Sequence, residues 1–252
     1  MLILGNWKLN GNKNILNDFF LELDFLCKKF QIKNDISISP PIIYLSQAYR
    51  ILKENKIKVT LTSQNVDIHI KGSFTGETSI NMLKDLNVKY VIVGHSERRV
   101  YHKEDNKIIS SKFHIVKEHN LTPVLCVGEV IKDNVNKSKM FIKSQIDTIL
   151  NNLGVESFRK SIIAYEPIWA IGSNTTADPN YVNEIHFFIK EYISDKDIFF
   201  KKNRILVQYG GSVSEQNINN FINKKYIDGF LIGGASLSIK TFFPIIKILE
   251  TF

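Results

Sequence analysis

A chain of 252 residues that is 44% hydrophobic and 23% charged can bury a sizeable core, which excludes a disordered or fibrous protein. The formal net charge of +8 comes from scattered lysines, without a basic stripe interleaved with aromatic residues, so it indicates no nucleic-acid partner. No run of about 18 apolar residues occurs and the first residues lack a signal-peptide pattern, so we expect a cytoplasmic protein without a membrane partner.

Short apolar or β-branched segments alternate along the chain with longer amphipathic segments. The short ones lie at 2–7, 36–41, 58–65, 88–94, 122–128, 161–167, 204–210 and 227–233. Helical patterns fill the intervals, as at 14–30, where Ile15, Phe19 and Leu23 recur at a helical spacing. This alternation predicts βα units around a parallel sheet, and eight such strands predict a closed (β/α)8 barrel, an α/β fold.

No linker or low-complexity segment divides the chain, so we expect one domain over residues 1–252. An open, doubly wound sheet is the alternative arrangement of βα units. It is disfavoured because no G-x-G-x-x-G follows the first predicted strand. In a barrel, functional side chains lie at the carboxyl ends of the strands and on the loops that follow.

Polar side chains and glycines gather where the predicted strands end. These strand ends are Asn6-Trp7-Lys8, Gly94-His95-Ser96-Glu97, Tyr165-Glu166-Pro167, Gly210-Gly211-Ser212 and Gly233-Gly234. They supply an ammonium, an imidazole, a carboxylate, and glycine pairs whose exposed backbone N–H groups can hold a phosphate. The set suits proton abstraction next to a carbonyl in a phosphorylated small molecule.

Each of these residues, taken alone, also has a structural explanation. A lone strand-end glutamate is usually solvated or salt-bridged, a lone histidine is more often structural, and one glycine pair can be only a turn. Their conjunction favours a functional site. The remaining histidines lack metal-ligand spacing, so we expect no metal. Cys27 and Cys126 lack a C-x-x-C spacing and are expected in the core.

Longer motifs run in register almost from end to end and resemble the triosephosphate isomerase family. They are NWKLN at 6–10, SQNVD at 63–67, GSFTGETS at 72–79, YVIVGHSERR at 90–99, LTPVLCVGE at 121–129, AYEPIWAIG at 164–172, YGGSV at 209–213 and GFLIGGASL at 229–237. The resemblance implies a single-domain TIM barrel. It also implies a cofactor-free aldose–ketose isomerase that interconverts D-glyceraldehyde 3-phosphate and dihydroxyacetone phosphate in glycolysis and gluconeogenesis.

The resemblance assigns the proton transfer to two residues. Glu166 is implied as the base that moves a proton between neighbouring carbons through an enediolate, and His95 as the group that polarises the substrate oxygens. His95 precedes a predicted helix, whose N-terminus disfavours a cation, so we expect a neutral imidazole.

Four further residues surround this pair in the implied site. Asn6 and Lys8 are implied to stabilise the negative charge of the enediolate. Glu97 is placed to hold the lysine by charge pairing. Ser96 is implied to help orient the site.

The segment Pro167 to Ala177 resembles the family's lid. Its residues are Pro167, Ile168, Trp169, Ala170, Ile171, Gly172, Ser173, Asn174, Thr175, Thr176 and Ala177. Gly172 is implied to join Ser212, Gly233 and Gly234 in binding the phosphate. Closure would exclude water and so prevent loss of phosphate from the intermediate.

Two features of the lid remain open from the sequence. Ile171 and Leu231 resemble a clamp over the base, although Leu231 also suits a core role in an apolar strand. The family's lid commonly ends in Gly-Thr-Gly-Lys, whereas this chain reads Gly-Ser-Asn-Thr at 172–175. This departure is either neutral drift or a shift in lid opening and closing.

The stretch 64–79 lacks a regular apolar period and predicts a long loop. In the family this loop inserts into a second subunit, with the residue matching Thr75 near the partner's lysine. The resemblance therefore implies a homodimer with Phe74, Thr75 and Gly76 at its interface. Two rival functions are another phosphosugar isomerase barrel and a non-catalytic phosphosugar-binding barrel, and the combined Lys8, His95 and Glu166 argue against both.

Overall fold

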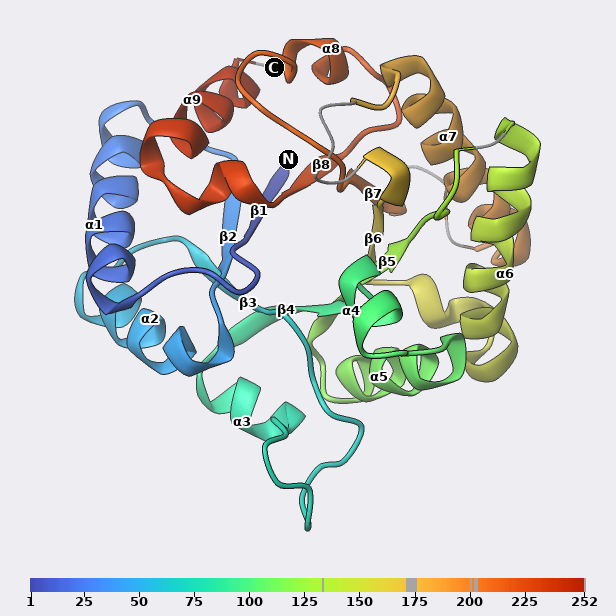
Figure 1. The fold of residues 1–252 in the computed structure, drawn as a ribbon, viewed down its shortest axis with the longest axis horizontal. Coiled ribbons are helices and arrows are strands. Elements are labelled where there is room, and N and C mark those ends of the chain that lie inside the picture. Colours follow the sequence, from blue (N-terminus) through green and yellow to red (C-terminus); the bar gives the residue numbers. More distant parts are fainter. Residues whose placement is uncertain (133, 171–175, 200, 202–203, 252) are drawn as a thin grey trace.

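The computed structural model describes residues 1–132, 134–170, 176–199, 201 and 204–251. Within these residues, eight parallel strands form a closed barrel in sequence order, surrounded by helices (Figure 1). The strands are β1 Leu2–Asn6, β2 Asp35–Ser39, β3 Thr60–Ser63, β4 Val88–Val93, β5 Thr122–Val127, β6 Ile162–Tyr165, β7 Leu206–Tyr209 and β8 Gly229–Ile232. Each lies within a predicted strand except β2, which begins one residue before the predicted segment 36–41, and the predicted (β/α)8 TIM-barrel fold is confirmed.

The barrel closes where the last strand pairs with the first. Leu2 lies opposite Gly229 of β8 on one side and opposite Asp35 of β2 on the other. Because all neighbouring pairs are parallel, every strand points its carboxyl end toward the same mouth of the barrel. Residues that follow distant strands in the sequence are thereby collected at one rim.

The helices follow the predicted alternation. They are α1 Lys13–Lys29, α2 Ile42–Glu54, α3 Ile80–Asp85, α4 Ser96–Tyr101, α5 Asn106–Glu118, α6 Val135–Leu153, α7 Pro179–Lys196, α8 Asn219–Ile222 and α9 Ile239–Glu250, with 3-10 turns η1 Val155–Phe158, η2 Ile168–Ala170 and η4 Gly234–Leu237. None of these helices, within the part of the chain that is described, is long and apolar enough to cross a membrane.

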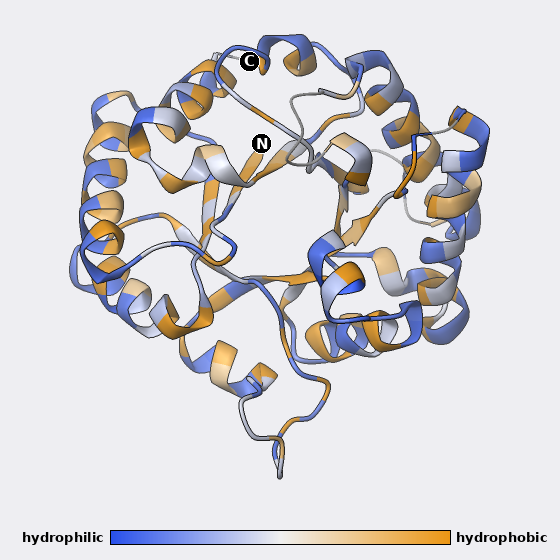
Figure 2. Cartoon of the chain, in the orientation of Figure 1, coloured by the Kyte–Doolittle hydropathy of each residue, from blue (hydrophilic) through white to orange (hydrophobic). Residues whose placement is uncertain are grey.

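Hydrophobic residues of the helices mostly face the barrel, and hydrophilic ones face outward (Figure 2). In α1 the buried face consists of Leu16, Phe19, Phe20 and Leu23. Ile15, which fits the same spacing in the sequence, lies one position away from this face and is 45% exposed. The helix begins at the side chain of Asn12, which accepts hydrogen bonds from two backbone N–H groups of the first turn.

Two hydrophobic clusters fill the molecule on either side of the barrel wall. Strand residues alternate between them, so that Ile3 joins the outer cluster under the helices while Leu2 and Leu4 join the inner one. Cys126 is buried in the inner cluster, as predicted, and Cys27 is partly buried against the outer cluster. Burial, helped by nearby acidic residues, raises the pKa of Cys27 to about 11.

Residues 64–79, here called the β3–α3 loop, form neither helix nor strand and project from the body of the barrel (Figure 1). The predicted long loop is thus confirmed.

His186 is a fully buried imidazole on α7. Its Nδ1 contacts the carbonyl oxygen of Tyr226 at 3.2 Å, its edge meets the ring of Tyr165, and its Nε2 has no hydrogen-bond partner among the described residues. Burial, with a smaller contribution from the charge of Lys190, lowers the pKa of His186 to about 3 against the opposing effect of the contact with Tyr226. The ring is therefore held neutral in the folded protein.

Acid is expected to destabilise the fold through this residue. An unfolded histidine binds its proton near pH 6.5, whereas folded His186 binds it only near pH 3, so between these values the unfolded chain holds more protons. The free energy of unfolding should fall by up to about 1.4 kcal/mol per pH unit below pH 6.5, and the variant His186→Phe should lose this contribution. Urea unfolding at several pH values measures it, with the exposed His114→Phe as control. Equal slopes for the wild type and His186→Phe would contradict the prediction.

Candidate active site

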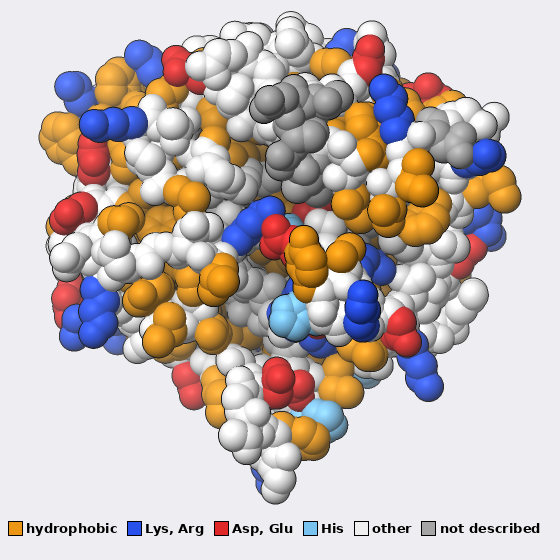
Figure 3. Space-filling view, in the orientation of Figure 1, with side chains coloured by type: hydrophobic (Ala, Val, Ile, Leu, Met, Phe, Trp, Pro, Cys, Tyr) orange, Lys and Arg blue, Asp and Glu red, His pale blue; other side chains and the backbone are white. Residues whose placement is uncertain are grey.

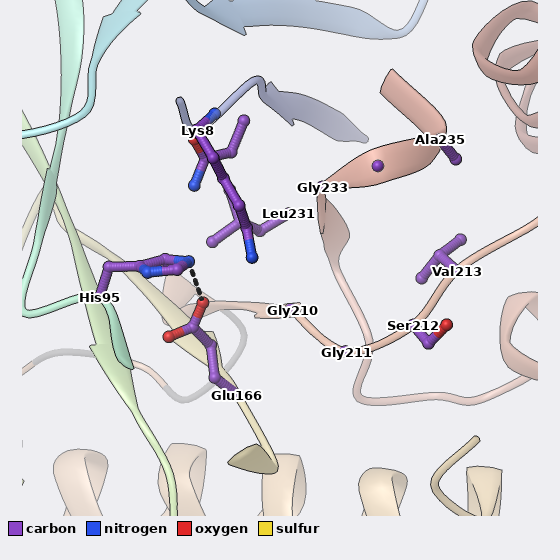
Figure 4. Close-up of a pocket in the computed structure, with 12 residues that line it drawn as sticks. Lys8, His95, Glu166, Gly210, Gly211, Ser212, Val213, Leu231, Gly233 and Ala235 are labelled. Atoms are coloured by element: carbon purple, nitrogen blue, oxygen red, sulfur yellow. Dashed lines mark hydrogen bonds and ion pairs between the residues drawn. The ribbon is translucent and has the colours of Figure 1, made fainter. Parts of the chain in front are cut away.

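A cavity of about 250 Å³ opens at the carboxyl ends of the strands (Figure 4). It is lined by Asn6, Lys8, His95, Glu166, Gly210, Gly211, Ser212, Val213, Leu231, Gly233, Gly234 and Ala235. The predicted ammonium, imidazole, carboxylate and glycine pairs thus meet in one place, although they follow five different strands. Figure 4 shows His95 and Glu166 on one wall, with Ser212 and Ala235 across the cavity.

Glu166 follows β6 and carries a buried carboxylate. Its Oε1 lies 3.1 Å from Nε2 of His95, and its Oε2 accepts a hydrogen bond of 3.0 Å from the backbone N–H of Ser96. Burial alone would raise the pKa of this carboxyl, but the charge of His95 and the two hydrogen bonds outweigh it, so the pKa of Glu166 is lowered. The carboxylate is therefore unprotonated at neutral pH.

Two glycines make room for Glu166. A Cβ atom at Gly210 would lie 2.9 Å from Cγ of Glu166, and one at Gly128 would lie 1.9 Å from its carbonyl oxygen. No side chain fits at either position without moving Glu166. Gly128, which follows β5, and Gly210, which follows β7, thus leave the space that Glu166 occupies after β6.

His95 caps the N-terminus of α4. The backbone N–H of Glu97 points to Nδ1 of His95 at 3.3 Å, a contact that an unprotonated Nδ1 accepts and that leaves the Nε2 proton facing Glu166. Burial lowers the pKa of His95, but the charge of Glu166 and the hydrogen bond to it raise the pKa by more. The expectation of a neutral ring rested on the helix terminus alone, and the adjacent carboxylate acts against it.

Lys8 is held by its side chain and by its backbone. Its Nζ lies 2.7 Å from Oε1 of Glu97, the charge pair expected from the sequence. Its backbone is left-handed, with φ of 53°, and its N–H donates to Oδ1 of Asn6 at 3.0 Å. Gln64 donates to the carbonyl oxygen of Lys8 at 2.9 Å and to that of Ser39 at 2.9 Å. A strained residue is therefore fixed by hydrogen bonds from a neighbouring loop.

Glu129 is a residue of the site region that the sequence reasoning missed. Its Oε1 accepts hydrogen bonds from Tyr165 at 2.9 Å, Trp169 at 2.7 Å and Tyr181 at 3.3 Å. It thereby ties the end of β6 and the 3-10 turn η2 to α7. Glu129 follows β5, so the strand-end rule that singled out Glu166 could also have found it.

Arg99 was missed as well. Its guanidinium donates to the carbonyl oxygen of Gly94 at 2.8 Å, to that of Cys126 at 3.0 Å, and to Oδ1 of Asn106 at 2.7 Å. These bonds brace the end of β4 against β5, directly beside His95. Its place in the YVIVGHSERR motif is the signal that could have drawn attention to it.

The glycine pairs form the remaining wall. After β8, the turn η4 begins at Gly234, and Ser236 donates from its N–H and from its Oγ to the carbonyl oxygen of Gly233, at 2.9 and 2.7 Å. A Cβ at Gly233 would come within 3.5 Å of Cε of Lys8, whereas one at Gly234 would meet nothing within 4 Å. Backbone therefore approaches the cavity closely here.

The predicted lid lies partly within the described residues. Pro167 and η2 follow Glu166 directly, and the N–H of Ile168 donates to the carbonyl oxygen of Glu129 at 3.0 Å, while Ala177 is buried. Residues 171–175 lie outside the described residues. The predicted contacts of Ile171 and Gly172, and the departure from the family's lid at 172–175, therefore lie outside them too. Leu231 belongs to the inner core and also lines the cavity, so both of its expected roles fit.

The predicted interface residues Phe74, Thr75 and Gly76 lie exposed on the projecting β3–α3 loop. A second cavity, of about 590 Å³, adjoins the first and shares Asn6, Lys8 and His95 with it. Gly76 lines this second cavity, whereas no side chain of the loop lines the first. The loop therefore borders the site without being part of it.

A closed parallel barrel with a buried carboxylate, an imidazole and an ammonium at its carboxyl mouth defines a (β/α)8-barrel protein with a polar cavity at that mouth. Comparison with known proteins narrows this class. The family model described as triosephosphate isomerase matches residues 1–249. The chain belongs to the triosephosphate isomerase family.

Close relatives cover nearly the whole chain. The triosephosphate isomerase of Buchnera aphidicola subsp. Acyrthosiphon pisum (strain APS) is 49% identical over 98% of this chain and 96% of its own length. That of Buchnera aphidicola subsp. Schizaphis graminum (strain Sg) is 46% identical over 100% of this chain and 98% of its own. That of Blochmanniella floridana is 46% identical over 98% of this chain and 94% of its own.

The contact between His95 and Glu166 leads to a prediction for the free protein. Replacing His95 with Gln should raise the pKa of Glu166, because the charge that lowers it is lost while burial, which raises it, remains. The carboxyl carbon resonance of Glu166 in a pH titration by NMR measures this change. His114→Gln, at an exposed helix position, is the matched control. An unchanged titration of Glu166 in His95→Gln would show that the two side chains do not interact as described.

Proposed function

We propose that this protein interconverts D-glyceraldehyde 3-phosphate and dihydroxyacetone phosphate, as an isomerase of glycolysis and gluconeogenesis that acts in the cytoplasm without nucleic-acid or membrane partners. One observation carries the proposal: an unprotonated, buried Glu166 faces a cavity that also presents His95, Lys8 and two glycine pairs. The names of relatives that match the chain along its whole length support it.

Glu166 is proposed as the base. Its carboxylate takes the proton from the carbon next to the carbonyl, and the electron pair of that C–H bond moves toward the carbonyl oxygen to give an enediolate. The hydroxyl proton of the enediolate passes to the former carbonyl oxygen, and the protonated Glu166 returns its proton to the former carbonyl carbon, so that aldehyde and ketone are exchanged. Its lowered pKa keeps the base ready at neutral pH, and burial favours proton exchange with substrate over exchange with water.

His95 is proposed to polarise the substrate oxygens with its Nε2 proton. In the free protein Glu166 raises the pKa of this ring. Once the base accepts a proton its charge is gone, and burial, the largest cause, and the charge of Lys8 then lower the pKa of His95 by more than the charge of Glu97 raises it. A neutral ring that donates from Nε2 is therefore favoured when the enediolate is present.

Negative charge on the enediolate is proposed to be stabilised by Lys8 and Asn6, with Glu97 fixing the ammonium at 2.7 Å and the Ser96 N–H orienting the base at 3.0 Å. Fixed donors of this kind need no reorganisation when charge develops.

The phosphate of the substrate is proposed to bind at Ser212, Gly233 and Gly234. Exposed backbone at the ends of β7 and β8 supports this, because N–H groups there can approach an anion closely. Gly172 and the lid residues from Pro167 to Ala177 are proposed to close over the bound phosphate and exclude water.

A coupled assay with glyceraldehyde 3-phosphate, set beside a panel of other phosphosugars, tests the proposed activity. Turnover of the triose phosphate alone supports it. Turnover of another phosphosugar, or binding without turnover, would favour one of the two rival functions.

The base itself is tested by Glu166→Gln, which should lower kcat by about a thousandfold, since a positioned base contributes typically 10²–10⁴-fold. The fold should persist, which a urea unfolding midpoint checks. The exposed Glu118→Gln is the matched control and should keep wild-type activity. A loss of less than about tenfold in folded Glu166→Gln would remove the role of this residue.

A homodimer is proposed as the working form. Large apolar side chains are exposed around the second cavity, including Leu9 at 96% and Ile42 at 49%, and Phe74 on the loop is 42% exposed. Figure 3 shows the face of the molecule that is turned to the viewer in Figure 1. Near its centre a basic and an acidic side chain lie next to each other, with hydrophobic side chains around them. Such exposure at the rim of a cavity is typical of an interface. The proposed partner is a second copy, whose Thr75 would approach Lys8.

Sedimentation at micromolar concentration should therefore find about twice the chain mass of 29.0 kDa. The reason is that, in a two-fold arrangement, the exposed loop of each copy can occupy the second cavity of the other copy. A fully active monomer at the same concentration would contradict the proposed dimer while leaving the proposed activity intact.

A further inference from the structure

The β3–α3 loop contains a side-chain stack that no step of the proposed reaction uses. The imidazole of His69 lies flat on the ring of Phe74, with ring centroids 3.5 Å apart and an interplanar angle of 13°. Oδ1 of Asp67 lies 2.7 Å from Nδ1 of His69 and accepts a hydrogen bond of 2.8 Å from its backbone N–H. Asp67 thus orients His69, and His69 orients Phe74.

The backbone of the loop closes around this stack. At its neck the N–H of Asp67 donates to the carbonyl oxygen of Thr78 at 2.9 Å. Near the tip the N–H of Phe74 donates to the carbonyl oxygen of Gly72 at 3.0 Å, and that of Glu77 to the carbonyl oxygen of Phe74 at 3.1 Å. Gly72 has φ of 133°, and a Cβ there would lie 3.0 Å from Cε2 of Phe74. The ring therefore occupies space that only glycine leaves.

We propose that Asp67, His69 and Phe74, here called the loop clip, preform the tip of the β3–α3 loop for docking into a second copy of the chain. His69 is a positioning residue of the subunit interface. The inference rests on the homodimer proposed above. What it adds is the element that gives the loop its shape before the subunits meet.

The physical reason is the cost of ordering. A loop that is ordered only on association loses conformational entropy at that moment, which weakens binding, whereas a preformed loop does not. The clip lies away from the cavity that holds Glu166 and His95, so its loss affects association before chemistry. Because a two-fold dimer uses the loop twice, each change in the clip counts twice.

The test replaces His69 with Ala in the full chain and measures the dimer dissociation constant by sedimentation velocity from nanomolar to micromolar concentration. Loss of one aromatic pair changes an equilibrium constant by about a few-fold to tenfold. Because the dimer contains two loops, loss of both stacks should raise the dimer dissociation constant by about tenfold to a hundredfold. His69→Phe, which keeps a ring on Phe74, should restore most of the affinity. His114→Ala, an exposed histidine on α5, is the control and should leave the dimer unchanged.

A second readout separates positioning from a loss of fold. The specific activity of His69→Ala should fall on dilution into the nanomolar range and recover on concentration, while His69→Phe follows the wild type. Unchanged dimer affinity in His69→Ala, or equal weakening in Ala and Phe variants, would overturn the inference. Because affinity is measured without substrate, absence of isomerase activity in the wild type would count against the proposed function alone.

Discussion

The burial of one carboxylate is the constraint on which the site depends. An unpaired charge in this position would cost several kcal/mol, so Glu166 requires partners that reach it without water. His95 and the N–H of Ser96 meet that need only because α4 begins directly at the end of β4. Gly128 and Gly210 leave the necessary space on either side. The charge of Glu166, which follows β6, thereby requires glycine after the neighbouring strands β5 and β7 and hydrogen-bond donors after β4.

The closed barrel makes such cooperation possible between segments that are far apart in the sequence. The pairing of β1 with β8 brings Lys8, near the start of the chain, within contact distance of Gly233, near its end. The paired strands β1 and β8 bring these two residues to the same rim, and a hydrogen bond from Gln64 holds the backbone of Lys8 there. Groups that follow different strands are thus kept at fixed separations around one cavity.

Sequence patterns were sufficient for the barrel and for the lining of its cavity, because strand periodicity and strand-end polarity are local properties. They were insufficient where a residue's role depends on partners from several segments. Ile15 fits the apolar spacing of α1, yet the first turn buries Leu16 in its place and leaves Ile15 exposed. Glu129 collects donors from three elements, and the stack of His69 on Phe74 depends on a loop conformation that no periodicity describes. The raised pKa of His95 likewise follows from a contact across strands rather than from its helix.

Position 8 is under two opposing requirements. Its left-handed backbone favours glycine, whereas the cavity is lined there by the ammonium of Lys8. An L-residue with a long side chain pays for this conformation with about 1 kcal/mol or more, which glycine would avoid. Selection for a more stable fold alone would therefore remove the ammonium from the cavity. Engineering that ranks substitutions by stability would favour glycine here and would abolish the charge that faces Glu97. Position 8 thus marks a site at which the most stable backbone and an ammonium in the cavity exclude each other.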